Sequence, residues 1–195
     1  MNKSETPTRR FYAGVGEVSN EFALLEEELR DLVVRVVDAP LAHVLMSGIN
    51  TRGLADHFRR VVGYHHELPD SAIERMDAIY KAIQRISDMR NFVVHASWVK
   101  LTEPGEHLGT QSRYAGTRDG ADWYAKQSVW TPTDLADLAA FIVQVREAVA
   151  AFALDYFPGA PPETPWRREA WKRFSDAWQG IFDDAEALVA GERPS

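Results

Sequence analysis

Apolar side chains recur at steps of three and four residues along most of this chain, and this spacing restricts its fold more than any other feature. An α-helix places residues at such steps on one face, which must then be buried against another element. The predicted fold is therefore mainly α, a bundle of amphipathic helices. The stripes before the C-terminal region are Phe22, Leu25, Leu29, Leu32, Val33 and Val36; Leu54, Phe58, Val61 and Val62; Ile73, Met76, Ile79, Tyr80, Ile83, Ile86, Val93 and Val94; and Leu135, Leu138, Phe141, Ile142, Val145, Val149 and Phe152.

Helix-breaking and helix-capping residues set the limits of these segments. The first helix should end by residues 38–40, which include Pro40, and the region 41–66 should be divided at Ser47-Gly48 and at Gly53. The sequence from Ser71 to Glu74 has the form of a capping box and predicts the start of a long helix. Further along, Thr131-Pro132-Thr133-Asp134 joins an N-cap hydroxyl, a proline at the first helical position and an acid near the positive end of the helix dipole.

Residues 97–130 have a different pattern of residue types. Short aromatic and β-branched runs alternate there with Pro104-Gly105 and Asp119-Gly120, a pattern that predicts a small antiparallel β excursion. After the next helix, prolines punctuate residues 158–165 and prevent its continuation. An amphipathic C-terminal helix is expected over 166–192, where its large aromatic face either closes the bundle, which we favour, or binds a second copy.

The length of 195 residues suits one domain with a proper core. Hydrophobic residues make up 45% and charged residues 26% of the chain, as in ordinary globular proteins, so we expect most of it to fold. We divide the sequence into a flexible leader over 1–15, a helical domain over 16–157 that contains the β excursion, a proline-rich connector over 158–165, and the helix over 166–192.

The chain contains no cysteine, which excludes a disulfide framework, a thiolate zinc site and a cysteine nucleophile. No segment has the form of a signal peptide or of a membrane span, so we expect a cytoplasmic protein without membrane attachment. The formal charge of −7 disfavours broad electrostatic binding to nucleic acid, and any such contact should be local. The basic clusters, which we interpret as mostly solvated helix faces, are Arg9-Arg10, Arg59-Arg60, Lys81-Arg85-Arg90 and Arg167-Arg168-Lys172-Arg173.

The most informative polar residue is Arg90, which falls on the apolar face of the long helix that starts near Ser71. An arginine at such a position is paired inside the fold, placed at a subunit interface or directed into a cleft. Asn91 follows it directly, and His95 comes five residues after Arg90, near the expected end of the helix.

The run Arg90-Asn91-Phe92-Val93-Val94-His95 resembles the motif of the HEPN superfamily, in which an arginine and a polar residue precede a histidine on a helical bundle. The resemblance covers about residues 20–157, and the β excursion after the motif resembles some bacterial members. It implies a metal-independent endoribonuclease that leaves 2′,3′-cyclic phosphate ends and needs no cofactor. It also implies a homodimer that joins two motifs, and a toxin or defence role under an inhibitory protein partner.

The residue types fit that chemistry. Histidine is the usual proton-transfer side chain in catalysis, so His95 could take the proton of the 2′-hydroxyl or protonate the leaving oxygen. Arg90 could hold the charge that develops on the phosphorane, and Asn91 could orient the phosphate or the imidazole. On an ideal helix, however, Arg90 and His95 lie about 140° apart, so one chain alone makes a poor site.

Other interpretations remain open at this stage. His95 could stabilise the negative end of the helix dipole with Asn91 as its partner, while Arg90 forms a buried ion pair with Asp77 or with a glutamate of another helix. The chain would then be a non-catalytic module that binds protein or RNA. His57, His65 and His66 lack the spacing of metal ligands on a helix, so we predict no metal site.

Overall fold

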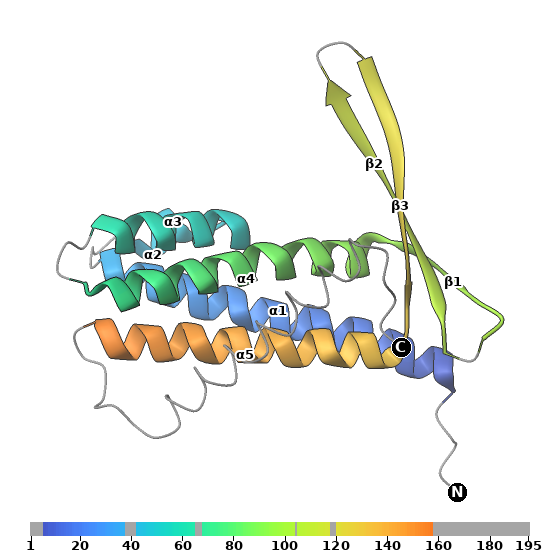
Figure 1. Cartoon of the computed structure of the whole chain (residues 1–195), viewed down its shortest axis with the longest axis horizontal. Helices are drawn as coiled ribbons and strands as arrows, with labels where there is room; N and C mark the ends of the chain where they lie inside the picture. The colour runs from blue at the N-terminus through green and yellow to red at the C-terminus, as the bar shows by residue number, and fades with distance from the viewer. Residues whose placement is uncertain (1–5, 38–41, 65–67, 104, 118–119, 158–195) are drawn as a thin grey trace, which may run out of the picture. The chain divides into compact units, whose positions relative to one another are not determined.

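The computed structural model describes residues 6–37, 42–64, 68–103, 105–117 and 120–157. Within these ranges the chain forms five helices: α1 (Pro7–Val37), α2 (Ala42–Met46), α3 (Thr51–Tyr64), α4 (Asp70–His95) and α5 (Pro132–Tyr156) (Figure 1). Three strands lie between α4 and α5 in the sequence: β1 (Ser97–Lys100), β2 (His107–Thr117) and β3 (Gly120–Trp130). The prediction of a mainly helical fold with a small antiparallel sheet after α4 is confirmed.

The chain divides into two compact units. The hairpin unit comprises the described residues of 1–23 and 86–140, and therefore holds the three strands and the end of α4. The helix unit comprises the described residues of 24–85 and 141–157, with α2, α3 and most of α5.

The core of the helix unit is made by the apolar stripes that the sequence analysis identified. Leu54, Phe58 and Val62 on α3 are buried, as are the stripe residues of α1 and α5 that belong to this unit. On α4, Met76, Ile79 and Ile83 are buried, whereas Ile73 and Tyr80 are half-buried. The rings of Phe58 and Phe152 meet edge to face with centroids 5.3 Å apart. At one end, Arg75 of α4 donates to Asp155 at 2.9 Å, and this link ties α4 to α5 within the unit.

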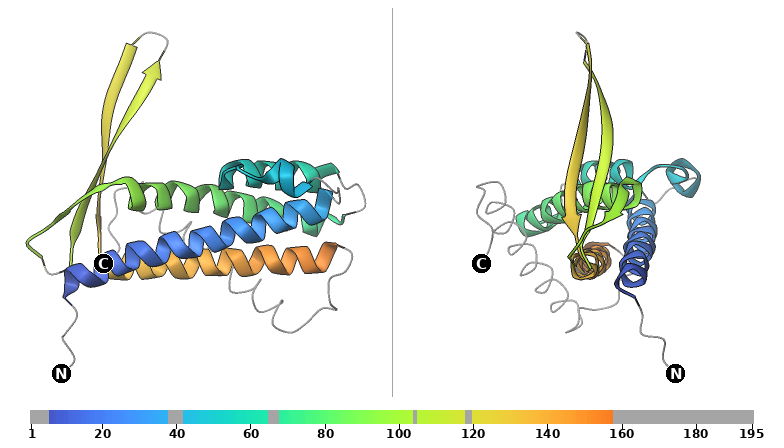
Figure 2. Two further views of the ribbon diagram at one scale, coloured as in Figure 1. Left: turned by 180° about the vertical axis from the view of Figure 1, so that it is seen from behind. Right: turned by 90° about the vertical axis from the view of Figure 1, so that its right-hand side faces the viewer.

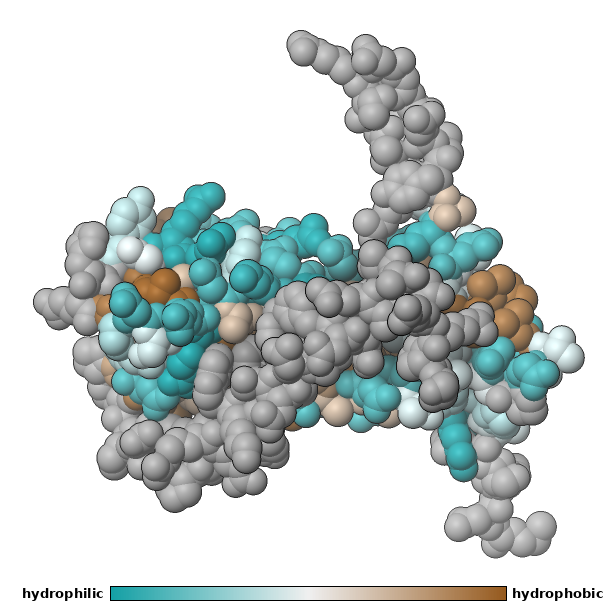
Figure 3. Space-filling model, viewed as in Figure 1, coloured by the Kyte–Doolittle hydropathy of each residue, from teal (hydrophilic) through white to brown (hydrophobic). Residues whose placement is uncertain are grey.

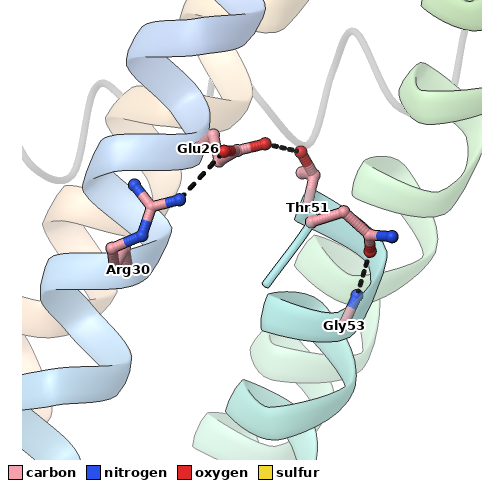
Figure 4. A network of polar contacts seen from close by, with 5 residues as sticks. Glu26, Arg30, Thr51 and Gly53 are labelled. Carbon is pink, nitrogen blue, oxygen red and sulfur yellow. Dashed lines mark hydrogen bonds and ion pairs between the residues drawn. The ribbon is translucent and has the colours of Figure 1, made fainter. Parts of the chain in front are cut away.

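The start of α3 is fixed by a polar network (Figure 4). Thr51 donates to a carboxylate oxygen of Glu26 at 2.5 Å, and the other oxygen of Glu26 accepts from Arg30 at 2.9 Å. The side chain of Asn50 accepts from the amide of Gly53 at 2.9 Å and so caps the helix. The prediction that Gly53 interrupts a helix is wrong. It lies in the first turn of α3, where an added Cβ would stand 2.6 Å from Ile49.

The two other predicted helix starts are close to the observed ones. At α5, the amide of Asp134 donates to the hydroxyl of Thr131 at 3.2 Å, and the amide of Thr131 donates back to the Asp134 carboxylate at 2.6 Å. This reciprocal cap confirms the predicted start. Helix α4 begins at Asp70, where the carbonyl of Pro69 accepts the first amides. Ser71 therefore lies inside the first turn, one residue past the start of the helix.

In the hairpin unit, β1, β2 and β3 form an antiparallel sheet in that order (Figure 2). β1 pairs with the first part of β2, from Ser97 opposite Thr110 to Lys100 opposite His107. β2 and β3 pair along their whole length, from His107 opposite Trp130 to Thr117 opposite Gly120. The positions predicted for the turns, around residues 104–105 and 119–120, agree with this register.

The beginning of α1 belongs to the core of the hairpin unit. Phe11 is fully buried: its ring stacks on His107 with centroids 3.8 Å apart and meets Trp98 at 4.9 Å. The prediction of a flexible leader over 1–15 is therefore wrong for residues 7–15, which are helical. The physical reason is that Phe11 covers the inner face of the sheet, a partner that local sequence does not show.

The predicted connector over 158–165 and the predicted helix over 166–192 lie outside the described residues. None of the helices that the structure describes has an apolar stretch long enough to cross a membrane. The coloured residues of the face in Figure 3 are mostly hydrophilic, with separate hydrophobic patches. Large exposed apolar side chains in the described residues include Val44 and Leu45 on α2, 68% and 63% exposed.

Candidate functional site

The three candidate residues all lie near the C-terminal end of α4, in the hairpin unit. Arg90 and Asn91 are half-buried, whereas His95, the last residue of the helix, is exposed. The predicted position of the motif, late on a long helix and directly before the strands, is confirmed.

The guanidinium group of Arg90 is held by neighbours without a negative charge. Its Cζ lies 5.1 Å from the centroid of the Phe22 ring, and its Nη1 donates to the side chain of Asn91 at 3.3 Å. Its Nε is buried without a hydrogen-bond partner. Asp77, one of the alternative partners considered for Arg90, instead binds Arg59 at 3.1 Å, so that alternative is wrong. Among the described residues, no carboxylate neutralises Arg90.

The sheet fixes the backbone of α4 around the motif. Gln111 on β2 donates through Nε2 to the carbonyl of Asn91 at 3.2 Å, and the indole Nε1 of Trp98 donates to the carbonyl of Val93 at 3.0 Å. Carbonyls near the end of a helix need such partners because the helix itself does not satisfy them all. The motif therefore has a rigid support that comes from the β excursion.

The interior side of the motif is apolar. Phe92 is buried, and its ring meets that of Trp98 edge to face at 5.8 Å. Gly109 lies directly against both rings: an added Cβ would stand 2.6 Å from Trp98 and 3.0 Å from Phe92. Because Gly109 has no side chain, both rings can pack directly against the backbone of β2.

A second cation lies beside the motif and was not identified from the sequence. The Nζ of Lys126 on β3 is 5.4 Å from the centroid of the Phe92 ring, and Lys126 is exposed. Lys126 is opposite Gln111 in the strand register, so both side chains leave the same face of the hairpin. Only the register brings Lys126 to α4, and no local signal at residue 126 indicates it.

His107 is a further histidine that sequence reasoning missed. It is 1% exposed, its Nδ1 lies 3.1 Å from the carbonyl oxygen of Gly105, and its ring stacks on Phe11. Its Nε2 is buried without a partner. These contacts make His107 a packing residue of the hairpin unit that has no path to solvent.

The arrangement of the motif around the helix determines what it can do. Asn91 and His95 are one turn apart and lie within about 40° of each other, whereas Arg90 lies about 140° from His95. No contact joins Arg90 to His95 among the described residues, and the expected hydrogen bond between His95 and Asn91 is absent there as well. Asn91 lies between them and is bound to Arg90.

The described residues contain no group of three or more metal-binding side chains placed to hold an ion. His65 and His66 lie outside the described residues. Comparisons with models of protein families, with curated proteins and with solved structures found no match to this chain.

Replacing Gly109 by alanine should destabilise the protein by about 1–3 kcal/mol, because the new methyl group forces Trp98 and Phe92 to move. Denaturant unfolding followed by tryptophan fluorescence measures this change. Gly16→Ala is the matched control: Gly16 lies in α1 with open space around it, so alanine there should stabilise the helix by about 0.5–1 kcal/mol. Equal effects of the two substitutions would contradict the proposed packing at Gly109.

Proposed function

We propose that this chain is a metal-independent endoribonuclease of the HEPN type that acts as a homodimer, with Arg90, Asn91 and His95 in the active site. The observation that carries the proposal is the environment of Arg90, whose charge is fixed against Phe22 and Asn91 without a carboxylate partner among the described residues. A half-buried guanidinium without a counter-ion favours the arrival of an anion, and a phosphate diester is the anion that the resemblance suggests.

The reaction would use only protein groups. The 2′-hydroxyl of the RNA attacks the adjacent phosphorus while a base, His95 of one subunit, takes its proton. The bond between phosphorus and the 5′-oxygen then breaks, and that oxygen leaves as a hydroxyl because it receives the proton that His95 has taken up, which returns His95 to its starting state. Arg90 stabilises the negative charge of the phosphorane. Asn91, which is already bound to Arg90, fixes the orientation of the guanidinium group. The products are a 2′,3′-cyclic phosphate and a 5′-hydroxyl end.

A second subunit is part of the proposal because of the helix geometry. His95 is exposed at the end of α4, about 140° around the helix from Arg90, and cannot share a phosphate with Arg90 of the same straight helix. Two copies of α4 that meet at their ends would place His95 of one subunit opposite Arg90 of the other. An inhibitory protein partner would act by covering that cleft.

The test is an assay of the purified full-length protein with mixed RNA in the presence of EDTA. Cleavage should continue, and the new 3′ ends should resist ligation until an enzyme that opens the cyclic phosphate and removes it is added. Products with free 3′-hydroxyl ends, or cleavage that stops in EDTA, would exclude this mechanism. If the protein cleaves none of the RNAs tested, only a non-catalytic binding function remains.

A second candidate function is a non-catalytic interaction module. Val44 and Leu45 favour it, because two large apolar residues exposed side by side on α2 are a common feature of protein-binding surfaces. In that case, Val44→Ser with Leu45→Ser should abolish capture of a protein partner, while His95→Ala should have no effect on it. Ribonuclease activity that depends on His95 would contradict the module as the main function.

Lys126→Ala should weaken RNA binding without removing cleavage, since Lys126 lies beside the motif and away from the reacting groups. The expected result is a higher KM with nearly unchanged kcat, and a slope of log Kd against log salt that is reduced by about one. Binding titrations at several salt concentrations measure this slope. Lys100→Ala, an exposed lysine on β1 of the same unit, is the control and should leave the slope unchanged. An equal reduction of the salt slope in both variants would show that Lys126 contributes no more to RNA binding than another exposed lysine of the unit.

A further inference from the structure

A separate open pocket lies in the helix unit, with a volume of about 450 Å³. This volume falls within the range of roughly 300–1,000 Å³ that is usual for small-molecule sites. Two arginines and one aspartate make the formal charge of the lining positive, although the whole chain is acidic. The lining residues are Asp56, Arg59, Arg60, Gly63 and Tyr64 from α3, and Tyr80 from α4.

Arg59 is held in place at one wall of the pocket. Its Nε binds Asp77 at 3.1 Å, and its Cζ lies 4.9 Å from the centroid of the Tyr80 ring. Tyr80 is itself fixed, because its hydroxyl donates to Asp56 at 2.9 Å. The side chain of Arg59 is nevertheless 52% exposed, so an ordered guanidinium faces the opening. Such pre-ordering lowers the entropic cost of binding an anion.

The hydrogen bond to Asp56 raises the pKa of Tyr80 above its usual value, with burial as a smaller cause. A tyrosine is protonated near neutral pH even at its ordinary pKa, so Tyr80 adds no negative charge to the pocket. Asp56 and Asp77 are both engaged, by Tyr80 and Arg59 respectively. Asp77 balances the charge of Arg59. Asp56 keeps its negative charge because its partner Tyr80 is neutral, so Arg60 is the cation of the lining without an ion-pair partner among the described residues.

Arg60 supplies a positive charge to the pocket, and Tyr64 supplies a flat apolar surface. Both are exposed, and Arg60 has no ion-pair partner among the described residues. Tyr64 is 77% exposed, an unusual state for a large aromatic side chain, and lies one helical turn after Arg60. Gly63 has open space where a Cβ would be, which leaves access between the two residues.

We propose that this pocket binds a small aryl phosphate, with its phosphate between Arg59 and Arg60 and its ring on Tyr64. Guanidinium groups hold phosphate oxygens in paired hydrogen bonds, and an exposed tyrosine offers its face for stacking. One helical turn rises about 5.4 Å, which suits a phosphate attached directly to a ring better than one separated from it by a sugar. This site is in the helix unit and is independent of the proposed ribonuclease activity.

The test is calorimetric titration of the full-length protein with four probes: phenyl phosphate, phenol, inorganic phosphate and AMP. Phenyl phosphate should bind at least about tenfold more tightly than each of the other three, since only it engages both halves of the pocket at once. Inorganic phosphate or AMP binding as tightly as phenyl phosphate would overturn the proposal. Because nothing is cleaved in this experiment, its failure is distinct from a failure of the ribonuclease proposal.

Variants locate the site. Arg60→Ala and Tyr64→Ala should each weaken phenyl phosphate binding by about tenfold, the effect of one charge-assisted hydrogen bond or one stacked ring. Tyr64→Phe retains the ring and should bind like the wild type, and so should Arg35→Ala, an exposed arginine on α1 of the same unit. Unchanged binding in both Arg60→Ala and Tyr64→Ala would overturn the assignment.

A further probe separates a free ligand from a group carried on a protein. A short peptide that contains phosphotyrosine presents the same aryl phosphate with a chain attached. It should bind more weakly than phenyl phosphate, because the pocket has room for a small molecule and its lining offers little to a peptide backbone. Tighter binding of the peptide would overturn the assignment to a small free ligand.

Discussion

Replacing His95 by alanine should reduce RNA cleavage by about 10²–10⁴-fold, the usual contribution of one general acid or base. The reason is specific to the proposed reaction, in which the exposed imidazole of His95 transfers the proton. The loss should appear in kcat, because proton transfer by His95 takes place only in the transition state. Initial rates with saturating RNA measure it.

The controls separate chemistry from folding. Because the His95 side chain is exposed, His95→Ala should change the free energy of unfolding by less than about 0.5 kcal/mol. His57→Gln replaces a half-buried histidine on α3 in the helix unit and should leave cleavage unchanged. A fully active His95→Ala protein would remove this histidine from the mechanism.

Mixing two inactive variants tests where the active site is built. A dimer of one Arg90→Ala subunit and one His95→Ala subunit holds one complete pair across the interface, so co-refolded mixtures should regain part of the wild-type activity. Arg90→Ala mixed with itself should regain none. A mixture that stays inactive, although exchange of subunits is demonstrated, would contradict a site shared between two chains.

Replacing Phe11 by alanine should destabilise the protein by about 3–5 kcal/mol, the usual cost of deleting a buried phenylalanine. Phe11 is fully buried against Trp98 and His107, and its removal would leave a cavity and free the stacked face of the histidine. The midpoint of urea unfolding, followed by tryptophan fluorescence, measures the change. The loss would show that the N-terminal turns of α1 are a structural part of the hairpin unit.

The neighbouring residue gives the comparison. Tyr12 is 54% exposed and meets Phe11 only edge to face, so Tyr12→Ala should cost less than about 1.5 kcal/mol. A Phe11→Ala protein as stable as the Tyr12→Ala protein would mean that residues 7–15 do not support the sheet. In that case residues 7–15 would behave as the flexible leader that was expected from the sequence.

The periodic stripes identified most helices because burial of one face is a local property of the sequence. The same rule failed for residues 7–15, although Phe11 and Val18 continue the stripe and are buried. Gly14 and Gly16 obscured the pattern, since glycine is unfavourable in a helix. Gly14 is required by packing: an added Cβ would stand 2.9 Å from Leu135. That close approach depends on tertiary structure and cannot be seen in the local pattern.

Tertiary contacts of the candidate site could not be predicted from the local sequence either. The spacing of Arg90, Asn91 and His95 located them on α4, but it could not give their neighbours. Asp77 was one of the partners considered for Arg90, but it lies 13 residues earlier on the same helix, a rise of about 20 Å, and Arg59 binds it. Lys126 was missed because its place beside Phe92 follows from strand register, and register is set by pairing along the whole hairpin.

Lys126 has one more consequence, which comes from its place in the sheet. β3 is an edge strand of the described sheet, and an open edge can recruit a strand of another molecule. A lysine on such an edge opposes self-addition, because an incoming copy would bring its own positive charge and would have to strip water from both ammonium groups. The residue that we expect to retain RNA would thus also keep the protein from aggregating through its own hairpin.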